Sequence, residues 1–165
     1  MRPILLTLTL LIVSCDSSHD EFIMRLNRDG HSWAEPAIFK FQPVFDGIET
    51  RVLAVIYSEK SIANDSIDSY LITFPRPIGE LSPGDEFSLT DSTFFPRKLV
   101  YWRRHASQDI SIVGINAKSG IVKINHVKYD TTNLIFGLEG RFNAVLSDSS
   151  KITNGYFKAQ IDIDY

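Results

Sequence analysis

Cys15 is the only cysteine in the chain, and its surroundings indicate the fate of its thiol. Arg2 is followed by the apolar run Ile4–Val13, and Ser14 stands immediately before the cysteine. A basic start, a short apolar run and a small residue form the layout of a secretory signal. The run is shorter than the roughly 20 apolar residues that a membrane-spanning helix needs. We therefore expect export, with residues 1–14 as the signal peptide, and a thiol that has no intrachain disulfide partner.

The order Ile12-Val13-Ser14-Cys15 resembles the lipobox of bacterial lipoproteins. The resemblance implies that the Cys15 thiol is acylated, with groups such as palmitate, that the segment before it is removed, and that Cys15 becomes the first residue of the mature chain. Residues 15–21 are mostly polar and are interpreted as a tether. A doubly acylated cysteine supplies the two lipid chains that stable anchoring needs.

A second group of residues that can do chemistry is the only basic cluster in the sequence. It comprises Arg97, Lys98, Tyr101, Trp102, Arg103 and Arg104, next to His105. Cations with interleaved aromatic rings suit an anionic lipid headgroup or an acidic polysaccharide. The alternative interpretation is the solvated end of a strand, whose side chains bind nothing. We treat the cluster as a candidate ligand patch.

The sequence contains no pattern of metal ligands or catalytic residues that stands out. None of the histidines, His19, His31, His105 and His126, pairs with another at ligand spacing, so we expect no metal site and no cofactor. Asp162 and Asp164 would lie about 7 Å apart on one face of a strand. That spacing suits calcium or glycoside hydrolysis, but solvated edge charges look the same. With no nucleophile motif and no phosphate-binding glycine loop, we predict no catalytic residues and no enzyme.

Composition restricts the class of protein. Apolar residues make up 44% of the chain, and the net charge is −3. An exported, mildly acidic chain is not expected to bind nucleic acid, which requires clustered excess base. Eleven Phe, six Tyr and two Trp, together with many β-branched residues, favour strands. We expect residues 22–165 to form a single β domain.

Strict alternation of apolar and polar side chains marks the clearest strands. In residues 134–146 the apolar side chains share one face, and Glu139, Arg141 and Asn143 share the other. The C-terminal segment Tyr156–Tyr165 alternates in the same way, and a Ser-Asp-Ser-Ser turn separates the two segments. Together they predict a long antiparallel hairpin that ends the fold.

The remaining segments predict shorter strands. Arg51–Tyr57 is a continuous apolar run, typical of a central strand, and Asn27–Gly30 marks a hairpin turn. We expect separate strands at 110–113 and 121–129, the second with a bulge midway, and one helical turn near 59–63 within a polar loop. The predicted fold class is all-β, an antiparallel sandwich or barrel of about nine or ten strands.

The C-terminal strand pattern resembles that of small uncharacterised lipoproteins of Bacteroidota. The resemblance rests on the lipobox at Cys15, on Gly140–Phe142 and on the segment Ile152–Phe157. It implies a lipid-anchored, β-rich domain at the outer membrane, on the periplasmic face or at the cell surface. It assigns no catalytic residue.

These observations favour a lipid-anchored protein of the cell envelope that acts as a binding or assembly module. Its partners would be the membrane, through the lipid on Cys15, and an envelope protein or a glycan. Two alternatives stay open. A lipocalin-like carrier would hold a small hydrophobic ligand in a cavity of roughly a few hundred Å3 lined by Phe and Tyr. A carbohydrate-active enzyme on a jelly-roll scaffold would bring two or three carboxylates together in one cleft.

Overall fold

The computed structural model describes residues 22–45, 50–62, 65–90, 99–105 and 111–162. Within these ranges lie nine strands and one short 3-10 helix. Their bounds are β1 Ile23–Arg28, β2 His31–Phe45, β3 Thr50–Ile62, β4 Ser66–Thr73, η2 Ile78–Glu80, β5 Glu86–Ser88, β6 Leu99–His105, β7 Ser111–Asp130, β8 Ile135–Leu146 and β9 Lys151–Asp162. This part of the chain is all-β, as the sequence predicts.

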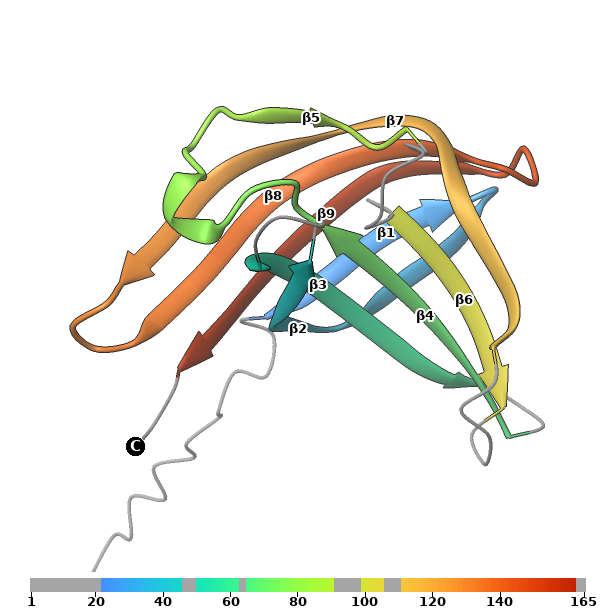
Figure 1. The fold of residues 1–165 in the computed structure, drawn as a ribbon. Helices are drawn as coiled ribbons and strands as arrows, with labels where there is room; N and C mark the ends of the chain where they lie inside the picture. Colours follow the sequence, from blue (N-terminus) through green and yellow to red (C-terminus); the bar gives the residue numbers. More distant parts are fainter. Residues whose placement is uncertain (1–21, 46–49, 63–64, 91–98, 106–110, 163–165) are drawn as a thin grey trace, which may run out of the picture.

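Eight of the described strands form a closed antiparallel barrel. Neighbouring strands follow the order β7, β6, β4, β3, β2, β1, β9, β8, and β8 pairs again with β7. Figure 1 shows β7, β8 and β9 arching over β3, β4 and β6. Among the described strands β5 pairs with β7 alone, so it lies outside the closed circuit. The fold is therefore a barrel, which is one of the two architectures that the sequence leaves open.

Two long strands close the barrel, because each passes from one partner to another along its length. β2 pairs with β1 as far as Pro36 and with β3 from Ala37 onward. β7 pairs with β6 as far as Asn116 and with β8 from there on. The strand expected at 121–129 and the described part of the strand expected at 110–113 belong to this single strand, so the prediction of two separate strands is wrong.

Gly120 lies inside β7, between the two segments that the sequence predicts as separate strands. Its φ is 147°, and a Cβ at this position would lie 2.4 Å from the carbonyl oxygen of Asn143 on β8. Glycine here allows two backbones to approach closely and does not end a strand. Further along β7 the pairing register shifts between Ile124 and His126, which confirms the predicted bulge.

Both predicted hairpins are confirmed. The β1–β2 hairpin turns at Asp29 and Gly30, whose φ angles of 47° and 86° suit a two-residue hairpin turn. The side-chain oxygen of Asn27 accepts a hydrogen bond of 2.8 Å from the Gly30 N–H. At the C-terminal end, β8 and β9 pair over nearly their full length. The turn between them places its backbone beside the β1–β2 turn, where the Asp29 N–H donates to the Lys151 carbonyl.

The helical turn expected near residues 59–63 is not formed over residues 59–62, the part of it that the structure describes. β3 continues to Ile62 and pairs with β4 along its whole polar end. This end is polar because it reaches the rim of the barrel, where Lys60 forms an ion pair of 2.6 Å with Glu35. Polar composition here therefore reflects a solvated rim, and the described part of the expected polar loop is mostly strand.

Aromatic side chains fill the middle of the barrel. Phe39, Phe74, Phe142 and Phe157 are among its most deeply buried residues. The ring centroids of Phe74 and Phe157 are 5.7 Å apart, and those of Phe142 and Phe157 are 6.3 Å apart. Packed rings of this kind combine a large buried apolar area with favourable ring–ring geometry. They hold together the strands that carry the surfaces described below.

The two ends of the barrel differ in character. At the polar end, charged and aromatic side chains surround a hollow of about 330 Å3, and Arg28, Lys60, Asp68 and Arg103 are among them. At the opposite end, the apolar end, a cleft of about 510 Å3 is lined by Phe41, Val52, Pro77, Ile78, Gly79, Glu80, Tyr129 and Phe136. The strands run between these two ends.

Candidate functional site

The structure separates the residues of the predicted ligand patch. Cys15, Arg97 and Lys98 lie outside the described residues. The other four belong to β6, where successive side chains face opposite sides of the sheet. Tyr101 and Arg103 line the hollow at the polar end. Trp102 lies over Gly114 on the outside of the barrel, so the described members do not form one continuous surface.

Both described arginines of that patch already have carboxylate partners. Arg103 holds Asp68 with two hydrogen bonds, 2.7 Å from Nε and 3.0 Å from Nη2, and this contact raises the pKa of Arg103. Arg104 lies 3.3 Å from the carboxylate of Glu59. Because each of these guanidinium groups is already paired with a carboxylate, the cations best placed to bind an external ligand lie elsewhere on the barrel.

A row of positive side chains crosses the outer face of β7, β8, β9 and β1. Antiparallel pairing places Lys123 opposite Arg141. Tyr156 on β9 lies opposite both Arg141 and Arg25, its neighbours on β8 and β1. Directly opposite Cβ atoms in such ladders are about 5 Å apart. Three cations and one phenol from four strands therefore form a continuous row.

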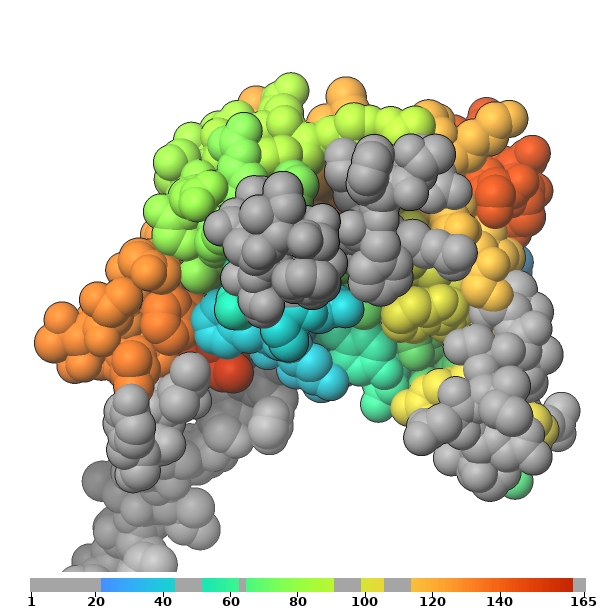
Figure 2. All heavy atoms as spheres, viewed as in Figure 1, coloured from blue at the N-terminus to red at the C-terminus, as the bar shows by residue number. Residues whose placement is uncertain are grey.

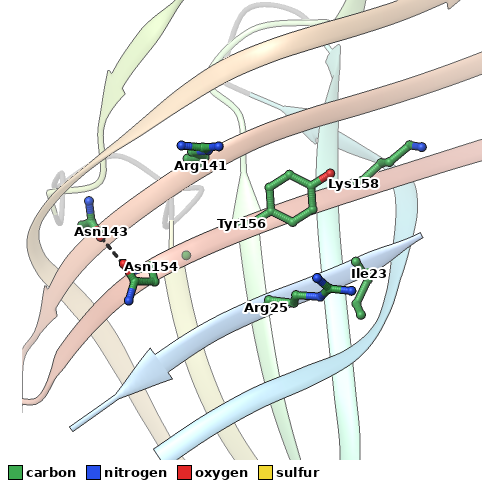
Figure 3. Close-up of a pocket in the computed structure, with 8 residues that line it drawn as sticks. Ile23, Arg25, Arg141, Asn143, Asn154, Tyr156 and Lys158 are labelled. Carbon is green, nitrogen blue, oxygen red and sulfur yellow. Dashed lines mark hydrogen bonds between the residues drawn. The ribbon is translucent and has the colours of Figure 1, made fainter. Parts of the chain in front are cut away.

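This row borders a cationic groove with a volume of about 680 Å3. Its lining residues, which Figure 3 shows, are Ile23, Arg25, Arg141, Asn143, Asn154, Gly155, Tyr156 and Lys158. Gly155 contributes backbone to this lining, and a Cβ there would lie 2.4 Å from the carbonyl oxygen of Phe142, so β8 and β9 approach closely beneath the groove. At one side, the Asn143 side-chain oxygen accepts a hydrogen bond of 3.2 Å from the Asn154 N–H, which holds that amide in place.

The groove keeps like charges together at some cost to the sheet. Directly opposite like charges, such as Lys123 and Arg141, destabilise a strand pair. Glu86 lies 3.0 Å from Lys123, but both side chains are more than half exposed, so this pair compensates weakly. In the described part of the chain, no carboxylate lies within salt-bridge distance of Arg25 or Arg141. The packing of the barrel does not require this repulsion, which leaves the guanidinium groups of Arg25 and Arg141 available to an anion.

Tyr156 stands between the two arginines as a neutral phenol. Partial burial, and then the charge and hydrogen bond of Glu139, raise the pKa of its hydroxyl, whereas Arg25 and Arg141 act to lower it. The hydroxyl therefore stays protonated at neutral pH and donates to Glu139. In Figure 3 its ring lies between the two guanidinium groups, so both can face a ligand in the groove.

The arrangement is suited to binding an anion. Guanidinium groups form paired, charge-assisted hydrogen bonds with carboxylate, sulfate or phosphate groups. The side-chain amides of Asn143 and Asn154 add neutral hydrogen-bonding groups beside them. Together, these groups match a ligand that carries both negative charge and hydroxyls.

The other residues considered from the sequence are scattered. His126 lies at the β7 bulge, opposite Glu139. Asp162 is the last residue of β9, and Asp164 lies outside the described residues, so the expected carboxylate pair is not tested. Across the described ranges, no group of three or more His, Cys, Asp or Glu side chains could hold a metal ion.

Sequence reasoning missed the cationic groove. The alternation placed Arg141 and Asn143 on the polar face of one strand, and Lys158 on the polar face of another. None of these segments by itself contains a cluster of charge, so the sequence alone does not single these residues out. The informative signal was that several polar faces all carried arginine or lysine, and only the strand order brings them together.

Compared with known protein families, with curated proteins and with solved structures, the chain matches none. A search of the described residues for a helix long and apolar enough to cross a membrane finds none.

Proposed function

We propose that this protein is an exported, lipid-anchored binding protein of the cell envelope, and that its cationic groove holds an acidic polysaccharide. The layout around Cys15 supports export and anchoring, and this location brings the domain close to envelope glycans. The observation that carries the proposal is the row of Lys123, Arg141, Tyr156 and Arg25 across four neighbouring strands. The protein would act by binding and not by catalysis.

The composition of the groove favours a glycan over a simple inorganic anion. A polysaccharide offers a charge at each acidic unit and hydroxyl groups between the charges. Arg25 and Arg141 would take the charges, and the amides of Asn143 and Asn154 would take the hydroxyls. Exposed charges attract over about 8–10 Å at ordinary salt, so binding should weaken as salt is added.

Binding of polygalacturonate by the full chain tests the proposal, with neutral dextran for comparison. The Arg141→Gln variant should bind polygalacturonate about tenfold more weakly, which is equivalent to about 1.4 kcal/mol. Lys40→Gln is the matched control, because it removes the same charge from an exposed position on β2, where Lys40 lies 4.9 Å from the Tyr57 ring. Equal losses in both variants, or equal binding of dextran, would contradict the proposal.

The two alternative functions have weaker support. A lipocalin-like carrier needs room among the interior side chains, whereas packed aromatic rings fill the middle of this barrel. Glycoside hydrolysis uses a pair of carboxylates on either side of the bond. Beside the groove, Glu139 supplies one carboxylate, and it is hydrogen-bonded to Tyr156.

A further inference from the structure

The apolar end of the barrel exposes side chains that would ordinarily be buried. Tyr129 is 53% exposed and Val52 is 47% exposed, and both line the cleft with Phe41 and Phe136. In Figure 2 the orange β7–β8 hairpin, the green segment around η2 and the cyan strands β2 and β3 adjoin on one face. These are the segments that line the cleft. Clustered exposed apolar groups mark an interaction surface more often than scattered ones do.

The rings of this cleft are held in place and are not loosely exposed. Phe136 packs edge-on against Phe41 with ring centroids 5.3 Å apart, and its centroid is 5.5 Å from that of Tyr129. The Tyr129 ring also lies against Gly79, where an added Cβ would come within 3.0 Å of it. The cleft is therefore a preformed surface whose most exposed ring carries a polar hydroxyl. Rings of this type favour the boundary between water and a bilayer.

The chain enters the barrel at this same end. β1 runs from Ile23 toward Arg28, and Arg28 belongs to the polar end. Phe22 accepts a hydrogen bond of 3.1 Å from the Ala37 N–H. It also lies beside Lys128 and Gly137, the immediate neighbours of Tyr129 and Phe136. The start of the domain is thus nearer to the apolar end than to the polar end.

The length of the tether fixes which end can meet the membrane. Cys15 and Ile23 are eight residues apart, so the chain between their Cα atoms spans at most about 29 Å. The ten-residue step along β8 from Phe136 to Leu146 covers about 33 Å. An acylated Cys15 therefore holds the apolar end near the bilayer, because even a fully extended tether is shorter than the path along β8 to the polar end. Charged groups such as the Arg28–Asp148 pair, 2.6 Å apart, also oppose contact of the polar end with lipid.

We propose that the apolar cleft docks on the membrane that holds the lipid of Cys15, so that the barrel stands with its polar end away from the bilayer. The proposal rests on the acylation assumed in the proposed function. The occupant of the cleft is the interfacial layer of that bilayer, with Tyr129 at headgroup depth and Val52 and Phe41 facing the acyl chains. The cationic groove, on the side of the barrel, stays open to solvent in this orientation.

Site-specific fluorescence on the acylated full chain, reconstituted in phosphatidylethanolamine and phosphatidylglycerol vesicles, tests the orientation. Acylation blocks Cys15, so a single introduced cysteine takes an environment-sensitive dye. Val52→Cys reports on the cleft, and Thr132→Cys in the exposed β7–β8 turn is a second reporter at the same end. Lys151→Cys, exposed at the start of β9 beside the polar end, is the control.

The dye at Val52→Cys and at Thr132→Cys should shift to the blue and lose most of its emission when the vesicle lipids carry brominated acyl chains. The dye at Lys151→Cys should show neither change. Equal behaviour at both ends would overturn the proposal. It would also be overturned if a brominated fatty acid quenched the Val52→Cys dye and brominated vesicle lipids did not, because that result identifies a carrier cleft.

Two controls separate this proposal from the proposed function. If the chain does not float with the vesicles, acylation of Cys15 is refuted, and with it the basis of both statements. If the chain floats and shows the expected quenching but does not bind polygalacturonate, only the glycan proposal fails.

Discussion

Replacing Phe157 with alanine tests whether the barrel interior is a filled core or a space for a ligand. The side chain is fully buried, and its ring packs against Phe74 and Phe142. On another side it faces Gly140, where an added Cβ would come within 2.6 Å of the ring. Rings and backbone therefore surround Phe157 on β9, and its removal leaves neighbours that cannot easily close the gap.

Two contributions set the size of the effect. Losing the burial of the ring costs about 1.5–3 kcal/mol. If the neighbours stay in place, a vacated space of about 100 Å3 costs a further 2.4 kcal/mol or so, at about 24 cal/mol per Å3. The expected loss of about 4–5 kcal/mol is a large part of the roughly 5–15 kcal/mol that stabilises a typical domain. It would lower Tm by roughly 8–20 °C.

Urea unfolding followed by circular dichroism measures this loss. Phe157→Leu should lie between alanine and the native protein, because it fills part of the space. Ile121→Ala is the surface control, since Ile121 is 56% exposed and such changes cost about 0.5 kcal/mol or less. If Phe157→Ala is no more harmful than Ile121→Ala, the interior is not a packed core. That result would restore the lipocalin-like carrier as the better explanation of the barrel.

Three further variants test individual contacts by urea unfolding. Gly140→Ala should lose about 1–3 kcal/mol, because its Cβ would lie 2.5 Å from the Lys123 carbonyl oxygen, and an unchanged stability would show that β7 and β8 are not packed so closely. Burial acts to raise the pKa of Asp148, but hydrogen bonds from its own turn and the charge of Arg28 outweigh it and hold the pKa below 3.8. A lowered folded-state pKa adds stability that is complete above the unfolded-state pKa and is lost as pH falls through the folded-state pKa. Asp148→Asn should therefore flatten the decline in stability below about pH 4. Burial raises the pKa of Tyr70 to about 12 from 10.0, so its contribution is complete below pH 10.0 and is lost as pH rises toward 12. Tyr70→Phe should therefore reduce the alkaline decline, and an identical decline in this variant would contradict the assignment.

The sequence alone was sufficient for features that depend on neighbours along the chain. The alternation in residues 134–146 predicted a half-buried strand, because only a two-residue period places its apolar side chains on one face. Asn27–Gly30 predicted the hairpin turn, because Asp29 and Gly30 can adopt the positive φ angles that such a turn requires. The change of apolar phase along 121–129 predicted the bulge that the β7–β8 register shows.

Local patterns failed where a contact distant in sequence changed their meaning. The sequence predicts separate strands before and after Gly120, but Gly120 lies inside β7 because the backbone of β8 passes close by. The polar residues near 59–63 looked like a helical turn within a loop, but β4 pairs with them and keeps the strand extended. In both cases the deciding partner is a different strand, and no local preference of the segment identifies it.

The candidate site depends entirely on contacts between residues that are distant in sequence. Lys123, Arg141 and Arg25 each stand on a polar strand face, and the sequence specifies those faces correctly. Their juxtaposition depends on β1 pairing with β9 and on β8 pairing with both β7 and β9. The predicted patch on β6 is instead divided between two sides of the sheet. Alternation turns Tyr101 and Arg103 toward the hollow at the polar end and Trp102 away from it. Sequence fixes on which side of its own strand a residue lies, and closure of the barrel decides which strands become neighbours.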